Sequence, residues 1–147
     1  AVAGPGGGAL LTGDIGARSE ARLAAAGRLR PTALVIAPHH GSRSSSSAAL
    51  VDAVRARYVV FTTGYANRWD FPRPDVVARW VAAGACPLTT AETGALRFVA
   101  IPGEGLRLAR AERLAWRPAW RRPGRIAACA LRSPGPPVYS GAGLVAP

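Results

Sequence analysis

Short apolar runs alternate with helix-like segments along residues 9–108 of this 147-residue chain. The runs end in turn-forming residues, and the segments between them space their apolar side chains three and four residues apart, which is typical of β-α-β units. The pattern predicts an α/β fold. We expect strands at 9–12, 33–37, 58–63, 87–89, 95–101 and 105–109, and helices at 19–26, 47–55 and 75–83.

Local signals mark the ends of these elements. Ser19 is expected to cap the first helix, and Gly27 to end it in the left-handed conformation. Pro74 and Asp75 suit the first turn of the third helix, where proline lacks no needed donor and a carboxylate meets the positive end of the helix dipole. A turn at 92–94 precedes an apolar strand, so the domain is expected to end in an antiparallel hairpin or meander.

The pattern changes beyond Leu108. Residues 107–132 contain eight Arg and one Glu, a net charge of +7, whereas the first 106 residues account for only +4 of the total of +11. The last fifteen residues are rich in Ser, Pro and Gly and show no periodicity. We therefore divide the chain into a Gly-rich lead-in at 1–8, one domain at 9–110, and a tail at 111–147 that is not expected to fold.

Scarce residue types limit the function classes. No apolar run approaches the roughly 18–20 residues that span a bilayer, and residues 1–8 lack the basic start of a signal peptide. The absence of Met suggests a processed product or a fragment.

Cys86 and Cys129 lie too far apart in sequence for CxxC redox or zinc-knuckle patterns. One disulfide is compatible with them, but two unpaired thiols are expected. With His39 and His40 as its only histidines, the chain alone offers few imidazole ligands for a metal.

Two predicted strands end in residues suited to chemistry. LLTGD at 10–14 delivers Asp14, and VIAPHHGS at 35–42 delivers His39 and His40, at the strand ends where ligands meet open α/β folds. Asp14 alone is equally consistent with a turn or a helix cap. Adjacent histidines on an extended segment point to opposite sides, so one at most faces a given metal. The other could bind substrate or hold a proton near neutral pH.

Two polar loops are expected at the same edge. Residues 42–47 form either a flexible loop with a helix cap at Ser46 or Ser47, or a loop that accepts phosphate beside Arg43. Residues 64–74, GYANRWDFPRP, either form a rigid connection or offer aromatic and guanidinium faces for bases and phosphates. The candidate substrate- or DNA-binding residues are Ser42, Arg43, Asn67, Arg68 and Arg73.

The ordered set of motifs resembles the C-terminal metallo-β-lactamase-like domain of ComEC-type DNA-internalisation competence proteins. It consists of LLTGD at 10–14, PHHGS at 38–42, GYxNRW at 64–69, PxP before a helix, and ETGALRFV at 92–99. Coverage is about residues 9–110. The resemblance implies that the chain is the C-terminal half of a metallo-β-lactamase αββα sandwich, which holds two metals between its sheets.

The resemblance also implies roles for single residues. Asp14 is expected to bridge two divalent metals, Zn or Mn, and to be both ligand and catalytic residue. One histidine of the pair is a metal ligand; we favour His40, with His39 as a catalytic residue near the substrate. The implied reaction is nuclease or phosphodiesterase cleavage of incoming single-stranded DNA without a nucleotide cofactor. The full-length protein would lie in the inner membrane, with this domain on the periplasmic side and the channel portion of the same protein as its partner.

Two departures from the family pattern matter. The H-x-H-x-D-H metal motif of the first half of the fold is absent, and DFPRP at 70–74 stands where many relatives have GHPHP. We therefore expect this polypeptide alone to hold the metals incompletely and to be inactive. Two other functions stay open: a free-standing metallo-β-lactamase-fold hydrolase of small phosphoesters or lactones, and a non-catalytic nucleic-acid-binding module that uses residues 107–125.

Overall fold

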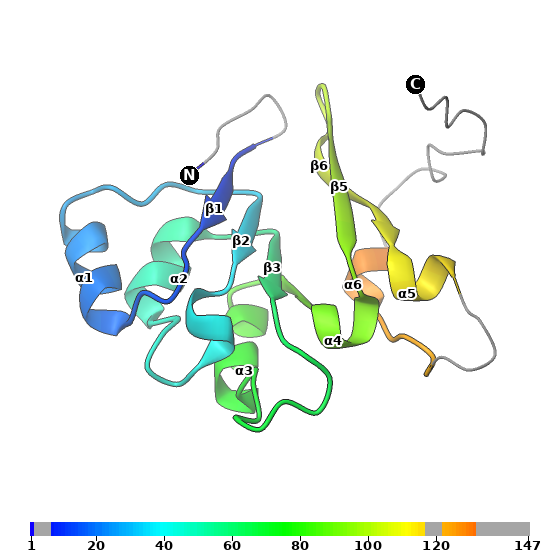
Figure 1. Ribbon diagram of the computed structural model, residues 1–147. Helices are drawn as coiled ribbons and strands as arrows, with labels where there is room; N and C mark the ends of the chain where they lie inside the picture. Colours follow the sequence, from blue (N-terminus) through cyan, green and yellow to red (C-terminus); the bar gives the residue numbers. More distant parts are fainter. Residues whose placement is uncertain (2–6, 117–121, 132–147) are drawn as a thin grey trace, which may run out of the picture.

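A four-stranded parallel sheet forms the centre of the protein, as seen in a computed structural model that describes residues 1, 7–116 and 122–131. The strands lie side by side in chain order (Figure 1). A helix lies in each connection, as parallel pairing requires. This arrangement confirms the expected α/β fold, whereas its identity as half of an αββα sandwich stays a prediction. The elements are β1 (Ala9–Leu11), α1 (Ala17–Ala25), β2 (Leu34–Ile36), α2 (Ala48–Val54), β3 (Tyr58–Phe61), α3 (Pro74–Ala82) and β4 (Cys86–Thr89).

The two faces of the sheet carry separate cores, because successive residues of a strand point to opposite sides. On β3, Val59 and Phe61 pack with α2 and α3, where Trp80 is fully buried. Tyr58 and Val60 belong to the core on the other face. All four residues of β3 are buried, which explains its uninterrupted apolar sequence.

An antiparallel hairpin covers the second face of the sheet. It consists of β5 (Leu96–Ile101) and β6 (Gly105–Ala111), and Figure 1 shows it on the opposite side from α1, α2 and α3. Phe98 contacts Tyr58 of β3, with ring centroids 5.3 Å apart. The expected hairpin is confirmed, but residues 92–94 do not form a simple turn. They belong to the short helix α4 (Thr90–Thr93) and to Gly94, which follows it with a positive φ of 69°.

The predicted helix boundaries hold to within two residues, with one wrong cap. Gly16, and not Ser19, precedes α1, because the backbone of Ala17 donates to the carbonyl of Ser44 at 2.8 Å and starts the helix there. Gly27 has a φ of 61° just beyond the helix, as expected. Pro74 begins α3 as its first residue.

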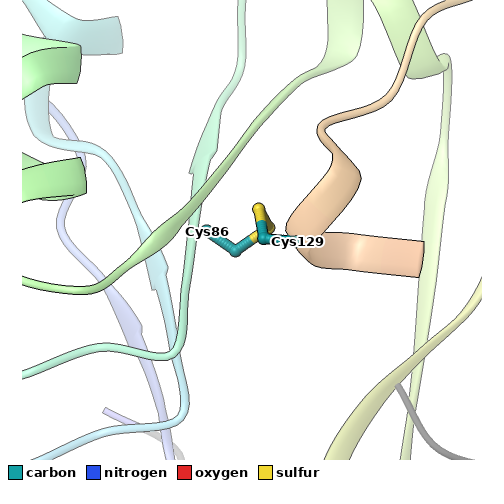
Figure 2. Close-up of a disulfide and its surroundings, with 2 residues drawn as sticks. All are labelled: Cys86 and Cys129. Carbon is teal, nitrogen blue, oxygen red and sulfur yellow. A yellow bond between two sulfur atoms is a disulfide. The ribbon is translucent and has the colours of Figure 1, made fainter. Parts of the chain in front are cut away.

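Residues 122–131 lie against the second face of the sheet, although we expected them in an unfolded tail. Ile126 and Ala127 contact its core, Ala130 in α6 (Ala128–Leu131) is buried there, and Cys129 forms a disulfide with Cys86 (Figure 2). The prediction of two unpaired thiols is therefore wrong: their 43-residue separation in sequence says nothing of distance in the fold, where the Cα atoms are 5.7 Å apart.

The rest of the expected tail is divided. Residues 111–116 complete β6 and form α5 (Glu112–Ala115), whereas 117–121 and 132–147 lie outside the described residues. None of the described helices is both long and apolar enough to cross a bilayer.

Candidate functional site

The carboxyl ends of three neighbouring strands bring the candidate chemistry together. Asp14 follows β1, the histidine pair lies in the 3-10 turn η1 (Pro38–Gly41) after β2, and Thr62 directly follows β3. The backbone amide of His39 donates to the carbonyl of Gly13 at 3.0 Å, which joins the first two connections. Their positions are thus set by the strand order and by backbone hydrogen bonds.

The histidine pair has an unusual backbone. His39 and His40 have φ values of 47° and 55°, and Gly41 has 87°. The expectation of an extended segment is wrong, since both histidines and the glycine that follows them have left-handed backbone conformations within a 3-10 turn. Non-glycine residues in this region cost about 1–3 kcal/mol each, and such strain collects at functional sites.

His40 and Asp14 face each other across this edge. Nε2 of His40 is 3.7 Å from Oδ1 of Asp14, while Nδ1 is hydrogen-bonded to the hydroxyl of Thr62 at 3.0 Å. The 3.7 Å separation is too long for a hydrogen bond. It is close to the separation of two ligands on one tetrahedral zinc ion, about 3.4 Å for metal–ligand distances near 2.1 Å. A second ring nitrogen fixed by a hydroxyl is a common support for a metal-binding histidine.

These two side chains fit part of a metal site. One carboxylate and one imidazole are ligands that zinc and manganese accept. Among the described residues, no group of three or more His, Cys, Asp or Glu side chains gathers around a possible metal position. Asp14 and His40 therefore supply two ligands, and a stable site needs others.

His39 is held differently. Its Nδ1 is 3.3 Å from the hydroxyl of Ser44, which in turn is 3.1 Å from that of Ser42. Its ring meets Phe71 edge-on, with centroids 6.0 Å apart. Within the described part of the chain, Nε2 of His39 has no hydrogen-bond partner, so it is the nitrogen free to exchange a proton with a ligand.

The histidine loop, residues 38–47, is anchored by a residue that sequence reasoning missed. Glu20 of α1 is fully buried, and its two oxygens accept from the backbone amides of Ser46 and Ser47 at 2.8 and 2.7 Å. Ser47 caps α2, which confirms one of the two expected caps. Because Glu20 occupies these amides, they are closed to the phosphate considered above. The sequence of α1 gave no signal, because Glu20 lies among two arginines and a serine and looks like any exposed acid of a surface helix.

The aromatic loop, residues 64–73, is organised by Asn67. Its amide donates to the carbonyl of Phe71 at 2.7 Å and accepts from the backbone amide of Phe71 at 2.9 Å. Asn67 therefore shapes the loop from within. Arg68 lies over the ring of Trp69, with the guanidinium carbon 4.3 Å from the ring centroid. The backbone of Arg73 donates to the carbonyl of Gly41 at 3.0 Å, which ties the aromatic loop to the histidine loop.

Several arginines near the site already have acidic partners. Arg43 donates to Asp75 at 3.1 Å, and Arg73 lies 3.6 Å from Asp70. Desolvation raises the pKa of Asp75, but the hydrogen bond and charge of Arg43, a backbone hydrogen bond and the charge of Arg79 together outweigh this, so that pKa lies below its ordinary value. Two of the candidate phosphate-binding residues are thus partly neutralised.

Arg122 joins the site from far along the chain. Its guanidinium donates to both carboxylate oxygens of Glu92, at 3.2 and 3.0 Å, and lies 4.3 Å from the centroid of the Tyr65 ring. The hydrogen bond from Arg122 to Glu92 raises the pKa of the arginine. The only signal in the sequence was that Arg122 lies in a basic segment, and this did not indicate which residues it would contact.

Comparison with known proteins gives one informative similarity. The chain is 42% identical over 96 residues to the competence protein ComA of Neisseria gonorrhoeae. The match covers 63% of this chain and spans only 14% of the length of that protein. No family model and no solved structure matches the chain. The expected similarity to a competence protein is confirmed, whereas the metallo-β-lactamase-like domain and its metal roles stay predictions.

Proposed function

We propose that this chain is the C-terminal part of a metal-dependent phosphodiesterase domain in a DNA-uptake protein. The observation that carries the proposal is the meeting of Asp14 and His40 at 3.7 Å on a strained turn at the carboxyl edge of a parallel sheet. The similarity to a competence protein supports the choice of DNA as substrate. The geometry supports hydrolysis, because an oxygen and a nitrogen ligand suit a metal that activates water.

The residues of the site would divide the work. Asp14 and His40 hold the metal, and Thr62 keeps the His40 ring turned toward Asp14. The bound metals would supply an activated water and stabilise charge on the departing oxygen. His39, fixed through Nδ1 by Ser44, keeps Nε2 available to move a proton at the scissile phosphate.

The remaining ligands would come from another part of the parent protein. Two protein ligands are fewer than a catalytic zinc site normally has. The matched relative is about seven times as long as the matched stretch, since only 14% of it is covered. We therefore propose that this polypeptide alone is inactive, and that its partners are single-stranded DNA and the membrane channel portion of the same protein.

The disulfide supports a position outside the cytoplasm. Structural disulfides persist in oxidising compartments and are rare where thiols are kept reduced. The Cys86–Cys129 bridge joins the sheet to α6 and so belongs to the folded core. We propose that this domain lies on the periplasmic side of the inner membrane, where incoming DNA arrives.

The parent protein provides the test. We expect it to cut single-stranded DNA when Mn²⁺ or Zn²⁺ is present, and Asp14→Ala to reduce the rate at least about a hundredfold, because a residue that would hold the metal is lost. Asp52→Ala, which removes an exposed acid from α2, is the control and keeps wild-type activity. A parent protein that binds DNA but cuts none, with any metal, would be the non-catalytic module. Cleavage that survives Asp14→Ala would contradict the assigned site.

A further inference from the structure

We propose that the aromatic loop is a stacking site for unpaired nucleobases, formed by the rings of Tyr65 and Trp69. The proposal deepens the proposed function and takes only its choice of DNA from it. It adds a mode of recognition: the bases of a single strand are bound by their flat faces.

Both rings are exposed and held in place. Tyr65 is 65% exposed and Trp69 is 57% exposed, although each ring already contacts a guanidinium at 4.3 Å. Single exposed aromatic residues are ordinary on protein surfaces. Two in one loop, whose shape is fixed by the hydrogen bonds of Asn67, form a platform that is ordered before ligand arrives.

A continuous row of rings connects this platform to the candidate metal ligands. Trp69 and Phe71 are stacked with an interplanar angle of 15° and centroids 6.4 Å apart, and Phe71 meets the edge of His39. A strand whose bases stack on Trp69 would therefore lie beside His39. The row gives the single strand a path into the site.

A hollow beside Tyr65 provides space for a base. It has a volume of about 290 Å³ and is lined by Tyr65, Asn67, Phe71 and Glu92, among others. This volume lies at the low end for small-ligand pockets. Its mixed polar and aromatic lining matches a nucleobase, which has flat apolar faces and polar edges.

The charges favour stacking over phosphate binding as the main source of affinity. Arg43, Arg73 and Arg122 are each paired with an acid, as described above. Arg68 has no acidic partner within the described ranges and is packed on Trp69. Few phosphates can then be neutralised at the aromatic loop, so the difference in affinity between a base-bearing and an abasic strand should depend little on salt. Duplex DNA hides its base faces and is therefore the poorer ligand.

The test compares base-bearing and abasic oligomers. Fluorescein-labelled (dT)₁₂ and an abasic phosphodiester of equal length are titrated with the whole chain, and anisotropy is measured. Each stacked base contributes roughly 1–3 kcal/mol, so we expect the abasic strand to bind at least about fivefold more weakly. Equal affinity for the two strands would overturn the proposal without any variant being made, and would leave the metal site unaffected.

Variants then locate the bases on the two rings. Trp69→Leu and Tyr65→Leu should each weaken (dT)₁₂ binding at least about fivefold, Trp69→Phe should restore most of it, and abasic binding should not change. Val81→Ala removes an exposed apolar side chain from α3, outside the aromatic loop, and serves as the control. Affinity unchanged in both loop variants would contradict the proposal. A uridine oligomer of the same length distinguishes RNA from DNA: stronger uridine binding lost in the same variants supports the stacking site but contradicts DNA as its ligand.

Discussion

The histidine loop and the aromatic loop lie side by side at one edge of the sheet, but they are built by different means. The histidine loop is fixed by backbone hydrogen bonds and by buried Glu20, which leaves His39 and His40 strained. The aromatic loop also contains two residues with positive φ, Ala66 and Asp70, but the side-chain amide of Asn67 shapes it from within, and it keeps two rings exposed. The contrast fits the proposed division of labour, in which the histidine loop positions groups for hydrolysis and the aromatic loop offers an accessible surface to a single strand.

Removal of the disulfide should produce the largest difference between the two loops. Removing a bridge that closes a 43-residue loop is expected to cost about 4 kcal/mol of stability on chain-entropy grounds. The double variant Cys86→Ala/Cys129→Ala should also release Arg122 from Tyr65. Hydrogen exchange measures the outcome: amides of residues 122–131 and of the aromatic loop should exchange faster through local opening, whereas those of 38–47 should change only by the global loss of stability. Equal loosening of both loops would contradict the division.

Glu20 should matter to the histidine loop alone. Glu20→Gln replaces an acceptor oxygen with an NH₂ group facing a buried backbone amide, so we expect a loss of about 2–4 kcal/mol in the free energy of unfolding. Urea denaturation measures this loss. Asp52→Asn, an exposed acid on α2, is the control and should lie within about 0.5 kcal/mol of wild type. A similar small effect for Glu20→Gln would show that the buried carboxylate does not anchor the loop.

A pair of glycines compares the packing of the loops directly. A Cβ on Gly41 would lie 2.7 Å from both Phe61 and Pro72, and its φ is 87°. Gly64, in the aromatic loop, has open space around the same position. Gly41→Ala should destabilise the protein by about 2–3 kcal/mol, whereas Gly64→Ala should change stability by less than about 0.5 kcal/mol. If the two variants melt at the same temperature, the predicted difference in packing between the two loops is wrong.

The smallest expected effect concerns the exposed pair Arg43–Asp75. The pKa of Asp75 is lowered in the folded state, so its stabilising effect is present above the ordinary value of 3.8 and is lost as the pH falls through the lowered pKa. Wild type should therefore lose slightly more stability on acidification below pH 4 than Asp75→Asn does. Melting curves between pH 6 and pH 2.5 measure the difference. If Asp75→Asn loses more stability than wild type on acidification, the predicted direction of the effect is wrong.

Much of the fold follows from local sequence. The apolar strands at β2 and β3 and the proline at the start of α3 specify their elements without help from the rest of the chain. The edge position of Asp14 and of the two histidines also follows, because parallel strands present their carboxyl ends together. The predictions that failed concern features that depend on contacts between residues far apart in sequence. Neither the Cys86–Cys129 bridge nor the docking of Arg122 on Tyr65 leaves a local pattern.

The prediction of an extended backbone at the histidine pair failed for a related reason. The left-handed conformation of His39 and His40 is costly for any residue with a Cβ, and it persists only because the surroundings impose it. The amide of His39 bonded to Gly13 and the close approach of Gly41 to Phe61 provide that constraint. No propensity at residues 39–40 predicts it.

The central claim is that Asp14 and His40 bind one metal ion, and the chain is well suited to testing it because it contains only two histidines. Imidazole ¹⁵N spectra recorded during a Zn²⁺ titration report each ring nitrogen, and a His39→Asn variant assigns the signals. We predict that Zn²⁺ shifts Nε2 of His40 and leaves His39 nearly unchanged, and that Asp14→Asn weakens this response at least about tenfold. Equal shifts of both rings, or a response that Asp14→Asn does not alter, would contradict the claim.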